Sequence, residues 1–291
     1  MPGVVRQTAR GQPKPDVEAG GGVLSRIAGV KPVSVDKQKW AIYGQPKTGK
    51  TRFACSFKKP LLLIGAEDGT ASVVGMKGVD FVQVQSLAEY SELVAEVRSS
   101  GRWASVVTDT LSKLRDMRIV ELFNEKGGSI PEKKPFMYAD KAWKEVWTQT
   151  GKDLKDALRP LLDAPRLMDL NVLTISQEAN LVFDDGNSAS SDLIRPSVGS
   201  AIGKSLCDWL HAECDYIGQT MIRPQMKTTN LPGGLTASQP TGKLEYCMRV
   251  SPDGVYQAGF RLPSGRTMLK EFLIDPSYAQ VCALIRGEKL G

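Results

Sequence analysis

The sequence predicts an α/β domain built around a mostly parallel central sheet. Short apolar runs recur over residues 40–175 and are separated by longer amphipathic stretches. Strands that alternate with helices in this way lie parallel in one sheet. Further along the chain, the strong turn signal Pro252-Asp253-Gly254 predicts an antiparallel hairpin that extends this sheet.

Five short segments have the length and β-branched content of buried strands. They are Trp40–Tyr43, Leu61–Ile64, Phe81–Val84, Ala104–Val107 and Val172–Ile175. Helices are expected at Thr51–Phe57, Leu87–Arg98, Leu111–Asn124 and Tyr138–Leu162. In the C-terminal part we expect strands at Tyr216–Met221, Leu244–Val250 and Tyr256–Leu262, and a last helix at Tyr278–Arg286.

The 291 residues suffice for one large domain or two small ones. The Gly/Pro-rich residues 1–33 predict a disordered basic tail, followed by one folded domain over residues 34–275 and a C-terminal helix and tail over 276–291. Residues 1–31 hold five basic and two acidic residues, so half of the formal net charge of +6 lies in the tail. Such a mild basic balance permits nucleic-acid binding but does not demonstrate it.

Composition argues against several classes of protein. The sequence has no run of about 18 apolar residues, so we expect no membrane span, and no signal-peptide core, so we expect a cytoplasmic protein. Five cysteines form no CxxC pair, which indicates reduced thiols. His211 is the only histidine, which argues against a histidine-rich metal site.

One segment, GQPKTGKT at residues 44–51, matches the pattern GxxxxGK[ST] at every fixed position. A predicted strand precedes it and a predicted helix follows, as in a phosphate-binding loop. Its glycines let successive backbone N–H groups turn toward phosphates. Lys50 is expected to reach the β- and γ-phosphates, and the Thr51 hydroxyl to bind Mg²⁺.

The sequence therefore predicts a nucleoside triphosphate site with Mg²⁺. No guanine-reading motif of the small-GTPase type is present, which favours ATP. The expected nucleotide-binding residues are Gly44, Gln45, Pro46, Lys47, Thr48, Gly49, Lys50, Thr51 and Arg52.

Three polar residues follow predicted strands and are candidates for catalysis. Asp109 ends the fourth strand and would complete the Mg²⁺ shell; the alternative is a cap for the helix that follows. Glu67 would activate the attacking water, with Asp68 as the competing candidate and a solvated turn as the ordinary alternative. Gln177 would sense the γ-phosphate, or would simply be a polar residue that leaves a strand.

A second segment, GSAIGKS at residues 199–205, is similar to a phosphate-binding loop but is one residue short between its glycines. No apolar strand leads into it. We interpret it as a loop and a helix start, in which Lys204 can still contact an anion.

The order of these motifs resembles the RecA-like core ATPases of bacteriophages, short relatives of RecA known as phage nucleotide-binding or single-strand annealing proteins. The similar segments are WAIYGQPKTGKT, PLLLIGAEDG, WASVVTDTL, NVLTISQE and CDYIGQ, within residues 35–270. The resemblance implies a RecA-like P-loop core with a C-terminal β-hairpin extension. It also implies that Glu67 activates water, that Asp109 is the second acidic motif and that Gln177 couples ATP to DNA-binding loops.

In that family two loops contact single-stranded DNA, and they match residues 125–135 and 180–204 here. Their cations would neutralise phosphates and their aromatic rings would stack on bases, with ordinary solvated loops as the alternative. The candidate cations are Lys126, Lys133, Lys134, Arg195 and Lys204, and the candidate rings are Phe136, Tyr138 and Phe183. A neighbouring copy would complete the ATP site with Arg261 or Arg266, unless these are plain surface charges.

Taken together, these features predict a P-loop ATPase that binds single-stranded DNA and promotes annealing or homologous recombination. The alternatives are a nucleotide-dependent assembly or regulatory ATPase that acts on a protein partner, and a replicative helicase-like ATPase. The expected cofactors are ATP and Mg²⁺. The expected partners are single-stranded DNA, further copies of the chain in a ring or filament, and a single-stranded DNA-binding protein.

Overall fold

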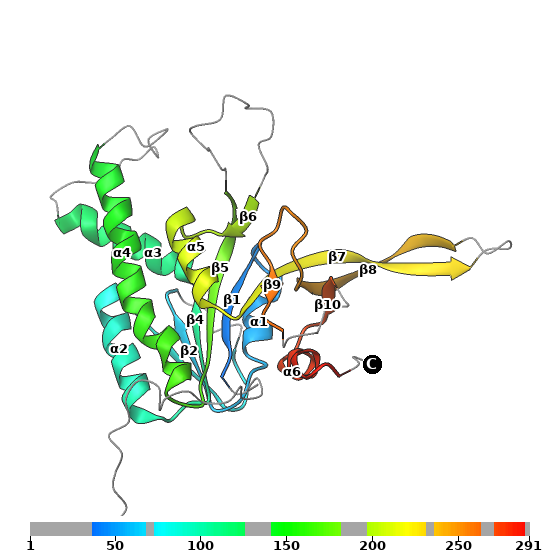
Figure 1. The fold of residues 1–291 in the computed structure, drawn as a ribbon, viewed down its shortest axis with the longest axis horizontal. Coiled ribbons are helices and arrows are strands. Elements are labelled where there is room, and N and C mark those ends of the chain that lie inside the picture. Colours follow the sequence, from blue (N-terminus) through cyan, green and yellow to red (C-terminus); the bar gives the residue numbers. More distant parts are fainter. Residues whose placement is uncertain are drawn as a thin grey trace, which may run out of the picture. The chain divides into compact units, whose positions relative to one another are not determined.

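The computed structural model of the chain describes residues 37–67, 73–125, 141–181, 197–230, 236–262 and 271–288. The chain divides into two units, residues 1–33 and 34–291, and every described residue belongs to the second. This second unit is an α/β fold in which helices cover a central sheet (Figure 1). No helix in the described ranges is long and apolar enough to cross a membrane.

The parallel part of the sheet has the strand order β3-β2-β4-β5-β1-β7. All five strands predicted in the first 175 residues are present, and the predicted fold class is confirmed. Because β5 lies between β1 and β4, the strands that end at Gly44 and at Asp109 are not neighbours, although both end at the same edge of the sheet. The bounds are β1 Lys39–Gly44, β2 Leu61–Gly65, β3 Val79–Gln83, β4 Ser105–Asp109, β5 Asn171–Leu181 and β7 Tyr216–Asn230.

The predicted helices form close to their expected bounds, except the first. That helix, α1, ends at Ala54 instead of Phe57, because the chain tightens there: the N–H groups of Ser56 and Phe57 donate to carbonyl oxygens three residues back, those of Phe53 and Ala54. The helices are α1 Lys50–Ala54, α2 Leu87–Ser100, α3 Leu111–Glu125, α4 Lys141–Asp163, α5 Lys204–Glu213 and α6 Tyr278–Arg286, with a 3₁₀ turn at Ala164–Arg166.

Alternate residues of the strands point to opposite faces of the sheet and build two cores. On one face, Leu62 and Ile64 pack with α2, α4 and α5. On the other face, Leu61 and Leu63 pack with α1 and α6. Trp40 centres this second core, where its ring stacks on Tyr216 with 4.8 Å between the ring centroids. Both faces are therefore buried, which explains why the strands read as continuous apolar runs.

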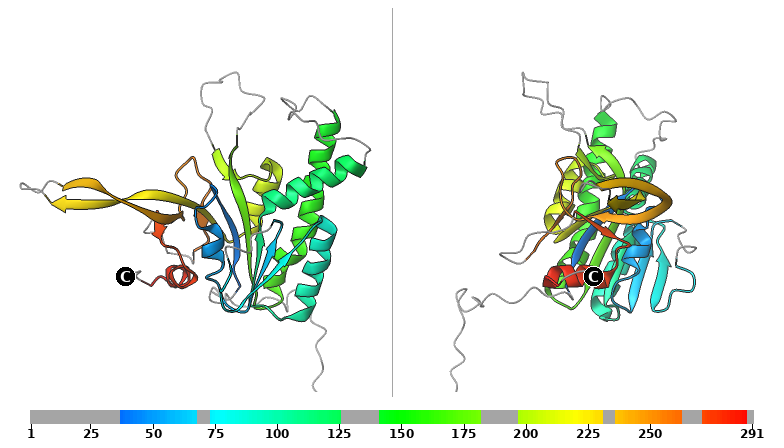
Figure 2. Two further views of the ribbon diagram at one scale, coloured as in Figure 1. Left: turned by 180° about the vertical axis from the view of Figure 1, so that it is seen from behind. Right: turned by 90° about the vertical axis from the view of Figure 1, so that its right-hand side faces the viewer.

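The C-terminal hairpin is formed by β7 and β8, Thr236–Arg249, which we call the β7–β8 ribbon (Figure 2). This corrects the prediction that residues 244–250 and 256–262 pair with each other around Pro252-Asp253-Gly254. Instead β9, Gly259–Phe260, pairs with the start of β7, and β10, Phe272–Ile274, pairs with β8. The Asp253 carboxylate accepts hydrogen bonds from the N–H groups of Val255 and Tyr256, so the turn exists but directs the chain across to β7.

One further prediction about residues 180–204 is wrong. The expected loop is shorter, because β5 continues to Leu181 and β6, Ser197–Ser200, pairs antiparallel with its end. The strand that leads into the segment 199–205 is therefore β6, which is not an apolar strand. The small and polar residues of β6 carry no apolar signal, and β6 joins the end of β5 through backbone pairing.

Candidate active site

The loop between β1 and α1 is shaped by two glycines. A Cβ atom added at Gly44 would lie 2.4 Å from both the carbonyl oxygen and Oγ1 of Thr220, so only glycine fits there. Gly49 is the N-cap of α1 with φ +87°, a left-handed conformation that glycine adopts at low cost. The Thr48 hydroxyl shares a hydrogen bond of 2.7 Å with Oγ1 of Thr220, which ties the loop to β7.

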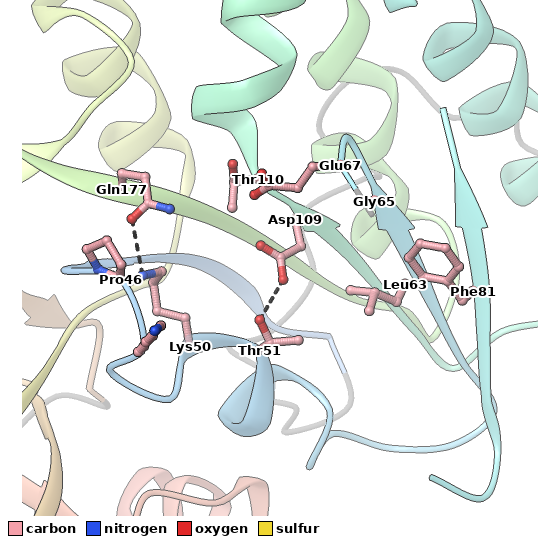
Figure 3. A pocket seen from close by; sticks show the side chains of 11 residues that line it. Pro46, Lys50, Thr51, Leu63, Gly65, Glu67, Phe81, Asp109, Thr110 and Gln177 are labelled. Carbon is pink, nitrogen blue, oxygen red and sulfur yellow. Dashed lines mark hydrogen bonds between the residues drawn. The ribbon is translucent and has the colours of Figure 1, made fainter. Parts of the chain in front are cut away.

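Lys50 is buried and curls back over this loop. Its Nζ donates to the carbonyl oxygens of Gly44 at 2.9 Å and Gln45 at 2.7 Å, and lies 3.5 Å from Oε1 of Gln177 (Figure 3). Burial lowers the pKa of Lys50, against the opposing effect of the carboxylates of Asp109, Glu178 and Glu67. An anion in the loop would therefore find an ammonium group whose present partners are only neutral oxygens.

Asp109 faces the start of α1. The Thr51 hydroxyl donates a hydrogen bond of 2.6 Å to Oδ2 of Asp109 (Figure 3). Burial raises the pKa of Asp109, and the hydrogen bond from Thr51 and the charge of Lys50 partly offset this. The alternative role as a helix cap is not supported, because Thr110 Oγ1 accepts the hydrogen bond from the N–H of Lys113 in the first turn of α3.

The oxygens of Thr51 and Asp109 fit Mg²⁺, which proteins commonly hold through one or two carboxylates together with substrate phosphates. The described residues contain no group of three or more His, Cys, Asp or Glu side chains that could hold a metal by themselves. Thr51 and Asp109 suit an ion that takes its remaining ligands from the phosphates of a bound nucleotide and from water.

A cavity of about 200 Å³ opens beside these residues. Glu67, which is exposed just after β2, and Gln177, near the middle of β5, both line it. Asp68, the competing candidate for the base, lies outside the described residues. The full lining is Pro46, Lys47, Lys50, Thr51, Leu63, Gly65, Glu67, Phe81, Asp109, Thr110 and Gln177 (Figure 3).

Comparison with known proteins bears directly on this arrangement. A family model described as an AAA domain matches residues 36–258, most of the chain. The chain belongs to the AAA domain family. The chain is thus a nucleotide-binding P-loop ATPase of the AAA type. The crystal structure of the RadB recombinase is similar to it with 16% identity and a TM-score of 0.36, and the match covers 69% of this chain and 86% of that one. No curated protein sequence matches the chain.

Glu178 of the AAA domain is a site residue that the sequence analysis missed. Its Oε1 accepts a hydrogen bond from Nε2 of Gln45 at 3.1 Å, and its Oε2 accepts one from Nε2 of Gln219 at 2.9 Å. Gln219 Oε1 in turn accepts from Nε of Arg249 at 3.3 Å. Glu178 therefore connects the phosphate-binding loop to the β7–β8 ribbon, and its place next to Gln177 was the only signal in the sequence.

Tyr246, on β8, is a second residue that the sequence did not indicate. A Cβ atom added at Gly49 would lie 3.2 Å from Cδ1 of Tyr246, so the ring rests on the loop. The guanidinium carbon of Arg52 lies 5.8 Å from the centre of this ring, and Arg52 also pairs with Asp275 at 4.0 Å. Tyr246 is 37% exposed, so part of its ring remains accessible beside the AAA domain's loop.

Most of the predicted DNA-binding residues lie outside the described part of the AAA domain. These are Lys126, Lys133, Lys134 and Arg195, with the rings of Phe136, Tyr138 and Phe183. Arg266, a candidate to complete the ATP site of a neighbouring copy, also lies outside the described residues. Lys204 is the first residue of α5 and lines a different cavity from Lys50. Arg261 forms an ion pair of 2.7 Å with Asp215 of the same chain.

Proposed function

We propose that this protein is an ATPase that hydrolyses ATP with Mg²⁺ beside Lys50 and couples this cycle to single-stranded DNA in annealing or homologous recombination. One observation carries the proposal: the side chains of Lys50, Thr51, Asp109 and Gln177 converge on one cavity at one edge of the sheet. They come from three separate elements, α1, β4 and β5.

In the proposed reaction, Lys50 exchanges its bonds to loop carbonyls for bonds to the β- and γ-phosphates. Backbone N–H groups of the loop hold the same phosphates. Thr51 and Asp109 would hold Mg²⁺, which supplies neutralisation of the negative charge that develops during transfer. Glu67 orients the water for in-line attack and accepts its proton, a role that requires a carboxylate within reach of the γ-phosphate.

Gln177 is the proposed link between the nucleotide and DNA. Its amide oxygen lies 3.5 Å from the Lys50 ammonium, and its carbonyl oxygen accepts a hydrogen bond of 2.7 Å from the N–H of Ala201. A change at the γ-phosphate that moves Gln177 would therefore also move the segment that precedes α5, through the hydrogen bond to Ala201. This segment follows Arg195 and leads directly to Lys204, the first residue of α5, and these are the two cations proposed to contact DNA there.

At the other end of the nucleotide, Tyr246 and Arg52 are the proposed contacts of the base and the α-phosphate. Stacking on an aromatic ring suits any base, so this contact supplies affinity more than selection. We further propose that copies of the chain assemble in a ring or filament on the strand, with a single-stranded DNA-binding protein as a further partner.

The experiment that tests the function is ATP turnover with and without single-stranded DNA. Turnover should rise with DNA in the wild-type chain and in Lys77→Ala, which changes an exposed lysine outside the cavity. It should vanish in Lys50→Ala. Charge reversal at Lys133, Lys134 and Arg195 together should abolish the stimulation and leave basal turnover unchanged. Turnover that depends on Lys50 but ignores DNA would reject the DNA role.

A second candidate function is an assembly or regulatory ATPase that acts on a protein partner. The observation that favours it is the β7–β8 ribbon, which exposes Met226 at 52% and Leu244 at 69%. Exposed apolar side chains on a projecting ribbon suit contact with protein. Two results together would favour this function. ATP turnover would be the same with and without DNA, and the double variant Met226→Ser, Leu244→Ser would lose affinity for a protein partner.

A further inference from the structure

A second cavity, of about 630 Å³, lies between α4 and the start of α5. It shares no lining residue with the cavity beside Lys50. Its lining carries an excess of positive charge, with four cationic side chains and one carboxylate, that of Asp156. These cations are Lys152, Lys155, Arg159 and Lys204. Its volume falls within the range of about 300–1,000 Å³ that small-molecule sites occupy.

The start of α5 repeats several features of the phosphate-binding loop. Each is reached from a strand, and each helix has a glycine N-cap with left-handed φ, +89° at Gly203 and +87° at Gly49. In both cases a lysine and a hydroxyl residue follow, here Lys204 and Ser205. The ψ angles differ, 144° at Gly203 and 14° at Gly49, so the two loops approach their helices from different directions.

Helix α5 has ten residues, and its N-cap residue is Gly203, which has no side chain to cap the first turn. The first N–H groups of any α-helix have no partner inside the helix and attract an anion. On the neighbouring helix, Nζ of Lys155 donates to Oγ of Ser205 at 3.1 Å, which brings a cation of α4 to the same place.

An independent observation comes from Thr150, in the wall of the same cavity. Its side chain is 1% exposed, and its hydroxyl has no hydrogen-bond partner among the residues that the structure describes. Buried hydroxyls without a partner are rare in folded proteins and require an explanation. Because the hydroxyl oxygen is itself buried, an oxygen of a bound ligand would become its partner only after the wall of the cavity shifts.

We propose that this cavity is a second phosphate-binding site, which holds a phosphoryl group of a nucleotide-sized ligand at the start of α5. The phosphoryl oxygens accept from the first N–H groups of α5, from Ser205 and from the ammonium groups of Lys155 and Lys204. A free polyphosphate and a nucleic-acid strand share this chemistry. For a nucleic-acid strand the inference rests on the DNA contact proposed above for Lys204, whereas for a free polyphosphate it is independent of the proposed function.

The test uses the full chain with Lys50→Ala, so that the first site makes no contribution. Inorganic tripolyphosphate and an oligothymidine strand serve as separate probes in isothermal titration calorimetry. We expect tripolyphosphate to bind at one site, and Lys204→Gln with Ser205→Ala to weaken it about tenfold or more. Lys77→Gln, which changes an exposed lysine away from this cavity, is the matched control and should bind as its parent does.

Thr150→Val provides a second variant whose two readouts separate structure from binding. Valine removes the unpaired hydroxyl at nearly constant shape, so the melting temperature of the unliganded chain should rise. If the hydroxyl serves the ligand, the affinity for tripolyphosphate should fall at the same time. A higher melting temperature with unchanged affinity would remove Thr150 from the site.

The two probes also distinguish the source of the phosphate. If tripolyphosphate binds, and the double variant Lys204→Gln, Ser205→Ala weakens this binding, the site is assigned to a free ligand. If only the strand binds, and the same variant weakens it, the phosphate belongs to a nucleic acid. Binding of neither probe, or binding that the variant does not change, would overturn the proposal.

Discussion

The Thr51 hydroxyl and the Asp109 carboxylate are joined by a hydrogen bond of 2.6 Å, although 58 positions separate them in the sequence. The sheet makes this contact, because β1 and β4 both pair with β5 and end at the same edge. Two oxygens that would bind Mg²⁺ are thus held together by the fold itself. Burial raises the pKa of Asp109, so this carboxylate is held at a cost in folding free energy.

Asp109→Asn should lower Mg²⁺-dependent ATP turnover and at the same time raise the stability of the fold. We expect Mg²⁺-dependent ATP turnover to fall about 100-fold or more, because the metal supplies several kcal/mol to the transition state. The raised pKa means that the folded chain binds the proton more tightly than the unfolded chain. Stability therefore falls as pH rises through this pKa, and asparagine should raise the melting temperature at pH 7.

The matched control for this variant is Asp169→Asn, which changes an aspartate whose side chain is 73% exposed. Its turnover and melting temperature should stay close to those of the wild-type chain. Full turnover in Asp109→Asn, measured over a Mg²⁺ titration, would show that another group holds the metal.

Glu178 should control the affinity for ATP rather than the chemical step. In Glu178→Gln, the amide oxygen can accept from Gln45 or from Gln219 but not from both, and one pair of donors is left facing each other. Loss of one charge-assisted hydrogen bond predicts a KM for ATP about tenfold higher, with kcat unchanged.

The double variant Glu178→Gln, Gln219→Glu is the matched control, because it exchanges donor and acceptor across the same contact. The new amide can donate to residue 219 and still accept from Gln45, so KM should return toward the wild-type value. A loss of kcat with unchanged KM in the single variant would assign Glu178 to the reaction itself.

Tyr246 should contribute to nucleotide affinity through its ring. Stacking on a base is worth about 1–3 kcal/mol, so Tyr246→Ala is expected to weaken ATP binding about tenfold, whereas Tyr246→Phe should bind normally. Leu244→Ala is the neighbouring control, since Leu244 points to the same face of β8 two residues away and is 69% exposed. Equal affinities of Tyr246→Ala and wild type in equilibrium binding would exclude the ring from the site.

The sequence predicted best those features that depend on a short local pattern of residues. Apolar runs predicted the parallel strands, and the fixed spacing of residues 44–51 predicted the phosphate-binding loop. Asp109, Glu67 and Gln177 became candidates because each follows an apolar strand core, and all three line the cavity beside Lys50. The sequence did not reveal β6 or the outer half of the β7–β8 ribbon, because their Ser-, Thr- and Gln-rich strands pair through the backbone and bury little apolar surface.

Two other features could not be predicted because they depend on which distant residues meet. The turn at Pro252-Asp253-Gly254 reverses the chain locally, but its residues carry no information about whether β7 or β8 receives the next strand. Glu178 meets Gln45 across 133 positions and Gln219 across 41. Tyr246 likewise reaches the loop only because β8 pairs with β7, and β7 with β1.

His211 should set the stability of the fold in mild acid. Its ring is largely buried, stacks on Tyr43 at 6.2 Å between ring centroids and lies 3.3 Å from Oγ of Ser200. Burial lowers the pKa of His211 to about 4. Since the unfolded chain then binds the proton more tightly, stability is lost as pH falls from about 6.5 toward 4, by about 1.4 kcal/mol between pH 8 and pH 5.5.

Because His211 is the only histidine, one variant isolates this effect. Urea unfolding of the wild-type chain and of His211→Gln at pH 8, 6.5 and 5.5 gives two curves of unfolding free energy against pH. Carboxylates contribute equally to both, so the difference between the curves reports His211 alone. From pH 8 to pH 5.5, the unfolding free energy of the wild-type chain should fall by about 1.4 kcal/mol relative to that of His211→Gln. A constant difference would mean that His211 has nearly the same pKa in the folded and unfolded chains and that its burial is relieved by solvent.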